Sequence, residues 1–404
     1  MLMRRIQSVR DRMFAYMVRN RLISARSCGF RSLRELTLQE CCGSLGSRLI
    51  EHERPRIVAC PLPANIPRRE DLSRQCGRYE RSFFDVPELQ LQARYSTRLE
   101  NCRILRHRNE WGDDFYVLVT KDDQQIPYSG TGFQPGHREL LRRDVVTRRL
   151  SEATWIITHS TRNHYMWLYN HLTRLMLAED LSLQQSVLFP EKSLLSTVKL
   201  ETLNRMGYDS PQFIQPDDQV IAVDRLNLME VDCFDPWALE RLRERLGGPP
   251  QAAPTRRIYI SRQKCHYRKL SNESELLPWL TAHGFETVFL EDLSLGQQIA
   301  TMQSAKVVLG VHGAGFANLL FCQPGTTVIE IQDPDDPNPH FYALAALLGF
   351  DYCLVVGDID PAAEPHFRDI SSDTPTIAEC LICEKALSIL PEVTGDGSSR
   401  VSES

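Results

Sequence analysis

The sequence VVLGVHGAGFAN, residues 307–318, decides the fold, because an apolar run passes directly into a glycine-rich turn. The apolar part predicts a buried strand, and a short helix is expected over residues 315–320. Glycines at positions 313 and 315 let the backbone approach a ligand closely, and the N–H groups at a helix start favour a phosphate. His312 follows the strand, at the carboxyl edge where open α/β sheets bind ligands. The pattern therefore predicts a phosphate-binding turn at His312, Gly313 and Gly315; in the alternative, the glycines only permit tight strand–helix packing.

Two polar residues downstream extend this predicted site. Glu330 ends the next predicted strand, residues 326–330, and a carboxylate there can accept hydrogen bonds from both hydroxyls of a ribose. Asn318 lies about one helical turn after the glycines, where it could orient His312 or the ligand. The alternatives are a solvated strand-end acid for Glu330 and an ordinary polar helix residue for Asn318.

A second candidate segment is IYISR, residues 258–262. Arg262 lies just beyond a predicted strand, at the same carboxyl edge as His312, and a fixed guanidinium fork suits a diphosphate. Arg268 and Asn272 follow where the next predicted helix begins. In the alternative, Arg268 and Lys269 belong to a solvated basic loop, and Glu273 is a helix-start carboxylate favoured by the helix dipole. Asn272 or Ser271 is the expected cap of this helix.

Strands and helices alternate regularly around these two segments. The predicted strands cover residues 257–261, 286–290, 306–310, 326–330 and 352–356, and the predicted helices cover residues 273–283, 295–304, 315–320 and 339–348. This alternation predicts a parallel sheet with helices on both faces. Just upstream, the sequence GGPP at residues 247–250 predicts a helix stop and a linker.

The part before this linker is less regular. Its predicted strands cover residues 115–119, 155–157, 186–188 and 219–223, and its predicted helices cover residues 164–178, 194–206 and 235–246. Residues 37–110 are rich in Arg and Pro and show little periodicity. We therefore predict an α/β protein with four parts: a basic N-terminal extension (1–50), an N-terminal domain (51–246), a C-terminal domain (251–375), and a C-terminal helix with a disordered tail (376–404).

The length and composition are those of a globular protein with two or three domains. The chain has 404 residues, of which 42% are hydrophobic and 25% charged. No apolar run approaches the roughly 18 residues of a membrane-spanning helix, and the net charge of −5 argues against general nucleic-acid binding. The twelve cysteines predict reduced thiols without structural zinc, because the Cys380–Cys383 pair has no second pair beside it.

Charge is distributed unevenly along the chain. Residues 1–150 carry 28 basic and 18 acidic side chains, a net charge of +10, and the remaining residues carry a net charge of −15. Residues 1–36 are rich in Arg and poor in acids, which is typical of a transit peptide or of a helix on an anionic membrane. A poorly ordered terminus is the equal alternative. We expect the basic part to face the acceptor or a membrane surface.

Taken together, these segments resemble the inverting glycosyltransferases of family 61. That family includes eukaryotic enzymes that add N-acetylglucosamine or xylose and bacterial members linked to surface polysaccharide, and we expect a bacterial-type member. The stretches RRIYISR (256–262) and RKLSNESEL (268–276) are similar to the family's Tyr-Ile-Ser-Arg block and to the Arg…Asn-Glu block that follows it. Residues 283–331 are similar to its most specific segment. The resemblance covers about residues 150–356 and is densest over 256–331.

The resemblance implies a GT-B fold, in which two Rossmann-like domains face each other across a cleft. The C-terminal domain would bind a sugar nucleotide, expected to be a UDP-sugar, and the N-terminal domain would bind a glycan or lipid-linked acceptor. The resemblance also implies a set of donor contacts without a metal: Arg262, Arg268, Asn272, His312, Gly313, Ala314, Gly315, Asn318 and Glu330.

One position departs from the family pattern. In NHYMWL, residues 163–168, Met166 occupies the place of the family's usual His. Direct displacement at the anomeric carbon requires the acceptor hydroxyl to lose a proton to a general base, and Met cannot accept it. His164 is the expected substitute, with His159 and His171 nearby. A different acceptor and mechanism, or lost activity, are the alternatives.

We therefore predict an inverting, metal-independent hexosyl- or pentosyltransferase with His164 and His312 as catalytic residues and no cofactor besides its donor. Its expected location is the cytoplasm, with peripheral contact at the inner face of an anionic membrane, and no nucleic-acid partner is expected. The alternatives are a nucleotide-sugar-binding protein without transfer activity and another Rossmann-type nucleotide enzyme. A nicotinamide enzyme would place a fuller glycine motif after its first strand, with an acid about 20 residues later.

Overall fold

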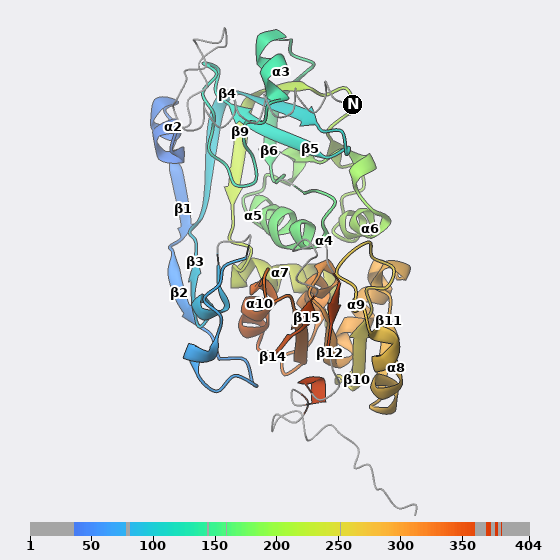
Figure 1. Ribbon diagram of the computed structural model, residues 1–404. Coiled ribbons are helices and arrows are strands. Elements are labelled where there is room, and N and C mark those ends of the chain that lie inside the picture. The colour runs from blue at the N-terminus through green and yellow to red at the C-terminus, as the bar shows by residue number, and fades with distance from the viewer. Residues whose placement is uncertain are drawn as a thin grey trace, which may run out of the picture.

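The computed structural model describes residues 36–77, 81–143, 145–158, 160–250, 252–359, 369–372, 376–378 and 381. The Arg-rich segment up to residue 35, His159, Cys380 and most of the predicted C-terminal tail lie outside these residues. The described chain forms two large sheets, one in each half, with helices between and around them, and two further sheets of two strands each (Figure 1).

The C-terminal half contains the predicted parallel sheet. Its strands are β10 (Arg256–Ile260), β11 (Phe285–Val288), β12 (Ala305–Val311), β13 (Thr327–Gln332) and β14 (Asp351–Val356). They lie in the order β11-β10-β12-β13-β14, and every neighbouring pair is parallel. The prediction of a parallel sheet is confirmed, with strand ends that differ by one or two residues. The exception that matters is β13, which continues to Gln332, so Glu330 lies within this strand and pairs with Gly310, not at its end as the sequence predicted.

Helices cover both faces of this sheet, as the sequence predicted. These helices are α8 (Glu273–Ala282), α9 (Leu295–Gln303), the 3-10 helix η8 (Ala314–Phe321) and α10 (His340–Leu348). Successive residues of a strand point to opposite faces. Leu309 of β12 accordingly packs in one cluster with Leu276 of α8, whereas Val308 packs in another with Ile299 of α9 and Phe316 of η8.

The strand order also fixes where a ligand crevice forms. Within this sheet β10 is the first strand along the chain. The next strand, β11, lies on one side of β10, and β12 lies on its other side. In open α/β sheets this reversal leaves a crevice beyond the carboxyl ends of the two central strands. Here those ends are Ile260 of β10 and the paired stretch of β12 around Gly310, immediately before Arg262 and His312.

The N-terminal half contains a larger, mixed sheet. Its strands are β1 (Leu49–Glu53), β4 (Arg94–Arg108), β9 (Val220–Glu230), β6 (Arg148–Trp155), β7 (Val187–Phe189) and β8 (Gln212–Phe213) in this order, with β5 (Asp114–Val119) paired to β4. The run β9-β6-β7-β8 is parallel, whereas β1, β5 and β9 pair antiparallel with β4. The predicted Rossmann-like organisation is therefore correct for the parallel part only.

The long strand β4 lies within residues 37–110, the stretch that shows little periodicity. Arg94 and Arg106 of this strand are buried, at positions where a sequence pattern would lead one to expect apolar residues. Arg94 bonds to Asp235 at 2.8 Å, and Arg106 pairs with Asp114 and Glu191. Acidic residues elsewhere in the chain neutralise these guanidinium groups, so charged side chains can occupy buried positions of the strand. The sequence pattern therefore does not predict this strand.

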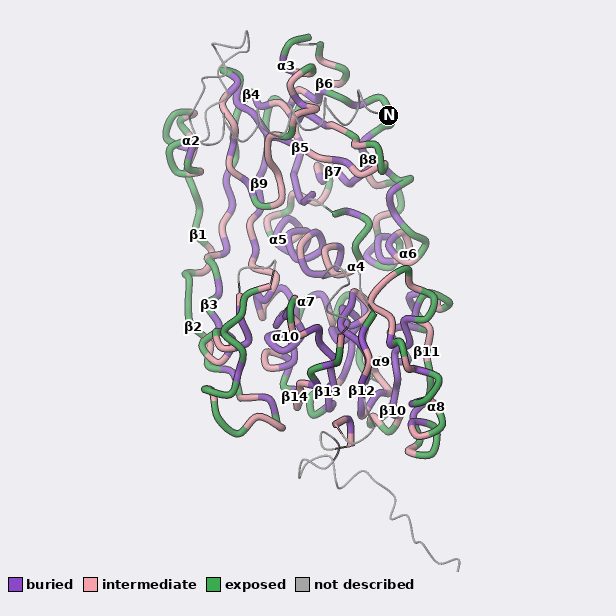
Figure 2. The backbone as a smooth tube through the Cα atoms, in the orientation of Figure 1, coloured by how far each residue is buried: buried purple, intermediate pink, exposed green. Residues whose placement is uncertain are grey.

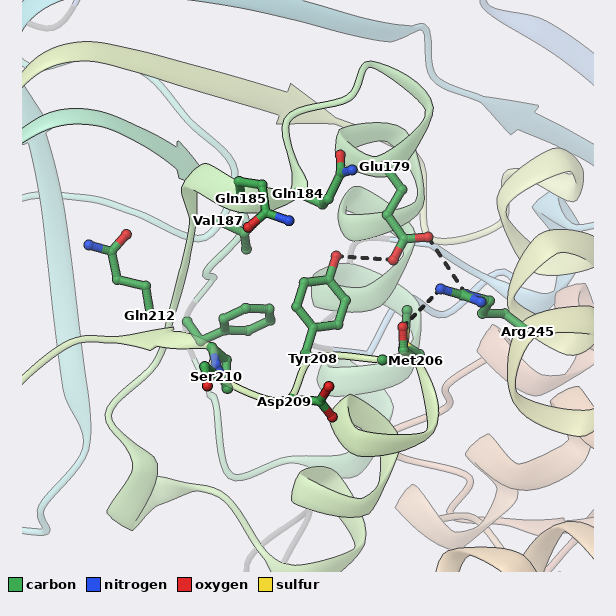
Figure 3. A pocket seen from close by; sticks show the side chains of 13 residues that line it. Glu179, Gln184, Gln185, Val187, Met206, Tyr208, Asp209, Ser210, Gln212 and Arg245 are labelled. Carbon is green, nitrogen blue, oxygen red and sulfur yellow. Dashed lines mark hydrogen bonds and ion pairs between the residues drawn. The ribbon is translucent and has the colours of Figure 1, made fainter.

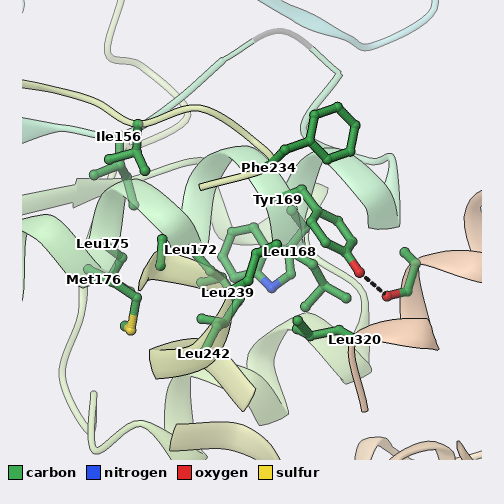
Figure 4. Close-up of a cluster of buried hydrophobic side chains, with 14 of the residues drawn as sticks. Ile156, Leu168, Tyr169, Leu172, Leu175, Met176, Phe234, Leu239, Leu242 and Leu320 are labelled. Atoms are coloured by element: carbon green, nitrogen blue, oxygen red, sulfur yellow. Dashed lines mark hydrogen bonds between the residues drawn. The ribbon is translucent and has the colours of Figure 1, made fainter. Parts of the chain in front are cut away.

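Helices from the N-terminal half join the two sheets through one hydrophobic core. They are α4 (His164–Met166), a π-helical turn (Trp167–His171), α5 (Leu172–Asp180), α6 (Thr197–Arg205) and α7 (Pro236–Gly247). Leu172 and Leu239 share a cluster with Leu320 of η8, and the Tyr169 hydroxyl donates to the Ala317 carbonyl oxygen at 2.8 Å (Figure 4). Figure 2 shows the same continuity, since buried backbone runs from the upper sheet through α5 and α7 into the lower one.

The remaining elements are peripheral. They are α2 (Leu38–Ser44), β2 (Arg56–Ala59), β3 (Glu88–Leu91), α3 (His137–Arg143), β15 (Asp358–Ile359), β16 (Ile370–Ser371) and the short 3-10 turns η2 (Arg69–Asp71), η3 (Phe83–Asp85), η5 (Gln184–Ser186), η6 (Lys192–Leu194) and η7 (Leu290–Asp292). The connection between β2 and β3 lies along the edge strand β14, where the Asn65 side chain donates to and accepts from the Leu354 backbone. Residues of the predicted N-terminal domain thus cover an edge of the C-terminal sheet, which blocks pairing with other chains. None of the described helices is long and apolar enough to cross a bilayer.

A buried histidine in α3 makes stability depend on pH. His137 is fully buried, its Nδ1 accepts from the Gln134 N–H, and its Nε2 donates to the Phe115 carbonyl oxygen. Burial lowers its pKa from 6.5 to about 4, so between those values the unfolded chain binds the proton more tightly. The contribution of neutral His137 to the free energy of unfolding is therefore fully present above pH 6.5 and decreases as the pH falls toward 4. At pH 5 the loss from this group should be about 2 kcal/mol.

Urea denaturation at pH 7 and pH 5 measures this effect. The unfolding midpoint should fall at pH 5, and a His137→Gln variant, which cannot titrate, should lose part of that difference. Equal pH dependence in the variant and the parent chain would show that His137 does not contribute.

Candidate active site

The two sequence segments singled out above meet at the crevice between β10 and β12. Arg262 lies two residues after β10, and His312 lies one residue after β12. Both side chains are nearly buried, each with 9% exposure. The 3-10 helix η8 begins at Ala314, so its first N–H groups lie at the same turn. The sequence alone therefore located this edge.

The Arg262 guanidinium is held in a fixed place by the turn it faces. Its Nε donates to the Arg268 carbonyl oxygen at 2.8 Å, and its Nη2 donates to the Tyr267 carbonyl oxygen at 3.1 Å. On the other side it lies against Gly313, where an added Cβ would be 1.8 Å from Nη1. Gly313 has an extended backbone with φ of 173°, which any residue can adopt. Glycine is therefore needed here for space, to admit the guanidinium.

His312 forms a buried pair with Glu330. Its Nδ1 is 2.6 Å from Glu330 Oε1, and the Tyr352 hydroxyl donates to Glu330 Oε2 at 2.6 Å. Glu330 has no exposed surface. Burial, and then the Glu330 carboxylate, raises the pKa of Tyr352, so that hydroxyl remains a donor. The pair fixes the imidazole with Nδ1 toward the sheet and leaves Nε2 for a ligand. Glu330 therefore positions His312, and its predicted contact with a nucleotide stays a prediction.

The loop after β13 adds residues that the sequence did not assign to the site. A small pocket, about 10 Å³ in volume, lies beside His312. It holds roughly one water molecule and so forms at most a corner of a larger site. Its lining residues are Arg268, His312, Gln332, Asp333, Asp336, Asn338 and Ile370. The Gln332 side-chain nitrogen donates to the Asn338 carbonyl oxygen at 2.9 Å and lies 3.2 Å from Nδ1 of His312, so this loop packs against the imidazole.

Helix α4 brings His164 from the N-terminal half to the same turn. His164 Nε2 is 3.4 Å from Asn318 Oδ1, although 154 positions separate the two residues. Burial, with a smaller effect of Lys199, lowers the pKa of His164 to about 4. Because Asn318 Oδ1 only accepts, the neutral ring carries its proton on Nε2 and keeps a lone pair on Nδ1. The structure thus joins two predicted site residues, His164 and Asn318.

The neighbours of His164 have other roles. Met166 contacts Asn170, whose side-chain N–H donates to its sulfur at 3.6 Å. His171 is fully buried, and its Nε2 accepts from the Thr158 N–H at 3.0 Å. His171 is thus used within the core, and His159 lies outside the described residues. Of the two described histidines, His164 and His171, it is His164 that contacts η8, through Asn318.

Asn272 and Glu273 support the Arg262 loop from behind. Asn272 makes side-chain hydrogen bonds to both backbone groups of Ser372. Glu273, at the start of α8, accepts from the hydroxyls of Tyr259 and Ser261 at 2.7 Å each. Ser261 precedes Arg262, so this network fixes the end of β10. A direct ligand contact by Asn272 stays a prediction.

Part of the chain matches a known protein family. Residues 138–329 match the family model described as Glycosyltransferase 61. The matched region includes Arg262, His312 and Asn318 and ends one residue before Glu330.

Three curated relatives carry related sequences. They are an EGF domain-specific O-linked N-acetylglucosamine transferase of Drosophila melanogaster (34% identity over 122 residues), a beta-1,2-xylosyltransferase of Arabidopsis thaliana (35% over 75 residues) and a protein O-linked-mannose beta-1,4-N-acetylglucosaminyltransferase 2 of Canis lupus familiaris (31% over 130 residues). The matches cover 30%, 18% and 30% of this chain, and 23%, 14% and 22% of the relatives' lengths, in that order. Residues 138–329, a little under half of the chain, are therefore similar to glycosyltransferase family 61.

Proposed function

We propose that this protein is an inverting glycosyltransferase that moves a sugar from a nucleoside diphosphate, expected to be UDP, to a glycan acceptor. The observation that supports this most strongly is the Arg262 guanidinium, fixed over Gly313 at the crevice between β10 and β12. A planar cation beside backbone N–H groups suits a diphosphate. The names of the relatives, all sugar transferases, support the same reaction class.

The departing diphosphate gains negative charge as the bond to the sugar breaks. Arg262 and the N–H groups at the start of η8 would stabilise that charge, with Nε2 of His312 as a further contact. Among the described residues, no three His, Cys, Asp or Glu side chains are grouped so that they could hold a metal. Metal independence stays part of the proposal.

The acceptor hydroxyl attacks the anomeric carbon from the face opposite the diphosphate. A new carbon–oxygen bond forms, the bond to the diphosphate breaks with its electron pair, and the acceptor proton passes to a base. We assign that base to Nδ1 of His164, because α4 contributes this imidazole from the N-terminal half. The two halves would then act as donor and acceptor sides of a GT-B enzyme. A cytoplasmic location, membrane contact and a role in bacterial surface polysaccharide rest on the sequence alone.

The proposed base makes a specific prediction about pH. With a pKa near 4, His164 is unprotonated over most of the working range, so kcat/KM should fall only below about pH 5. His164→Gln should lower kcat by about 100-fold and leave donor affinity nearly unchanged, since general-base catalysis contributes to the chemical step. Initial rates across pH 4–8, with donors chosen by a thermal-stabilisation screen of nucleotide sugars, test both expectations.

Two outcomes would contradict the assignment. An acid limb near pH 6.5 that persists in His164→Gln would assign the base elsewhere. Donor binding without any transfer, unchanged in His164→Gln, would favour a nucleotide-sugar-binding protein, the alternative that Met166 raised.

Glu330 offers a second test, which separates positioning from nucleotide contact. Glu330→Gln keeps the shape but removes the charge that orients His312, so kcat should fall by roughly 100-fold while the Kd for UDP changes little. Tyr352→Phe is the matched control, because it removes only the hydroxyl on the far side of the carboxylate. If Glu330→Gln instead weakened UDP binding tenfold and left kcat unchanged, Glu330 would be a nucleotide contact.

A further inference from the structure

A second pocket lies in the N-terminal half, outside the proposed transfer site. Its volume is about 450 Å³, within the range of small-ligand sites. It opens between the end of α5, the starts of β7 and β8, and the end of α7 (Figure 3). Its lining residues are Glu179, Gln184, Gln185, Val187, Phe189, Met206, Gly207, Tyr208, Asp209, Ser210, Pro211, Gln212 and Arg245.

The pocket is distant from His164 along one continuous helical segment. Glu179, near the end of α5, follows His164 by fifteen positions through α4, the π-helical turn and α5. At 1.5 Å per residue this is roughly 20 Å. Val187 and Gln212 are the first residues of β7 and β8, so the pocket lies at the amino edge of these strands. The diphosphate contacts lie at the carboxyl edge of the other sheet.

The lining combines an aromatic wall with planar polar groups. Tyr208 packs edge-on against Phe189, with ring centroids 5.3 Å apart. The Tyr208 hydroxyl donates to Glu179 Oε1 at 3.0 Å, which fixes the ring in the middle of the pocket (Figure 3). The amides of Gln184, Gln185 and Gln212 and the carboxylate of Asp209 also line the pocket. Amide groups both donate and accept hydrogen bonds, and carboxylates accept them.

The charges of the lining disfavour an anionic ligand. Glu179 and Asp209 are acidic, and Arg245 is the one basic residue of the lining. Its guanidinium is occupied, because Nη2 donates to the Met206 carbonyl oxygen at 2.8 Å and Nε lies 3.8 Å from Glu179. A phosphate or carboxylate would therefore meet two carboxylates and one guanidinium that already pairs with Glu179.

We propose that this pocket binds a neutral sugar unit. Sugar hydroxyls donate and accept hydrogen bonds as the amide and carboxylate lining does, and the apolar C–H face of a sugar ring can pack on Tyr208. Its use would be to hold a distal unit of the acceptor glycan while another unit reaches the transfer site. That use rests on the proposed glycosyl transfer, whereas sugar binding itself does not require turnover.

Ligand-detected NMR with the full chain tests the proposal directly. The probes are xylose, mannose and N-acetylglucosamine oligosaccharides, recorded by saturation transfer in the absence of nucleotide. We expect the protein to transfer saturation to at least one probe, which shows binding. In the double variant Gln185→Ala/Asp209→Ala, the affinity for that probe should be at least tenfold weaker. Both positions are exposed, so the fold should persist. Asp217→Ala, exposed on the same half but outside the lining, is the matched control and should bind as the parent chain does.

The outcomes separate this pocket from the transfer site. The absence of saturation transfer to every probe would overturn the proposal. Probe binding that is unchanged in Gln185→Ala/Asp209→Ala would also overturn it. Binding of inorganic phosphate in place of the sugars would also overturn it. UDP affinity, measured on the same samples, reports on the transfer site. Normal UDP binding without sugar binding would contradict only the proposed sugar pocket. Sugar binding without UDP binding would contradict only the proposed donor site.

Discussion

Replacing Gly313 with alanine should lower kcat/KM by about 10²–10³-fold, because the added methyl group would occupy the place of the Arg262 guanidinium. The Cβ would lie 1.8 Å from Nη1 and 2.7 Å from Cζ of Arg262, so the guanidinium must move away. The backbone conformation of Gly313 permits alanine. The expected loss therefore reflects the missing cation at the diphosphate, which at 100-fold is about 2.7 kcal/mol of transition-state stabilisation.

A glycine two residues later provides the matched control. An added Cβ at Gly315 would be 3.3 Å from Leu290 and 3.4 Å from Ile260 side-chain atoms, a contact that small adjustments relieve. The predicted ligand contact of Gly315 is through its backbone N–H, which alanine keeps, so Gly315→Ala should keep activity within a fewfold of the parent chain. Steady-state rates and melting temperatures of both variants decide the point: equal activity of Gly313→Ala and Gly315→Ala would show that the Arg262 position does not matter for catalysis.

Replacing Arg262 itself should have an effect of similar size, even when the charge is kept. The Arg262 guanidinium donates to the carbonyl oxygens of Tyr267 and Arg268 and at the same time faces Gly313. A lysine ammonium is a single point charge and cannot make this set of contacts. We expect Arg262→Lys to weaken UDP binding by at least tenfold and to lower kcat/KM by about 100-fold. Calorimetry and initial rates measure the two quantities separately.

A charged residue of the same half serves as the comparison for Arg262. Arg256 pairs with Glu286 at the opposite end of β10 and is partly exposed. Arg256→Lys should leave UDP binding and rates nearly unchanged. If Arg256→Lys and Arg262→Lys behaved alike, the loss would be a general effect on the sheet and the diphosphate role of Arg262 would be wrong.

The sequence predicted the C-terminal sheet well because local patterns determine it. Each strand there is a short apolar run, each helix follows at its expected spacing, and glycine turns mark the boundaries. The carboxyl ends of parallel strands lie at the same edge of a sheet. Predicting these strands from local patterns therefore also placed Arg262 and His312 at one edge. The position of Glu330 within β13 was missed, because a strand end is less well defined by sequence than its centre.

The rest depended on contacts between distant parts of the chain. The buried charge of Arg106 in β4 is compensated by Asp114 and Glu191, and no local pattern reveals such a partner. The same holds for the pairing of His164 with Asn318 and of Glu330 with Tyr352. A sequence can therefore indicate which residues are chemically suited to a site, while the partners that orient them emerge from the fold.

The most direct test of the central claim is a calorimetric titration of the full chain with UDP in the presence of EDTA. The claim is that Arg262, His312 and the turn at Gly313 bind a nucleoside diphosphate at the carboxyl ends of β10 and β12. It predicts saturable binding at one site, at least tenfold weaker in Arg262→Lys and unchanged in Gly315→Ala. The absence of binding by UDP and by GDP, or binding that Arg262→Lys leaves intact, would contradict it.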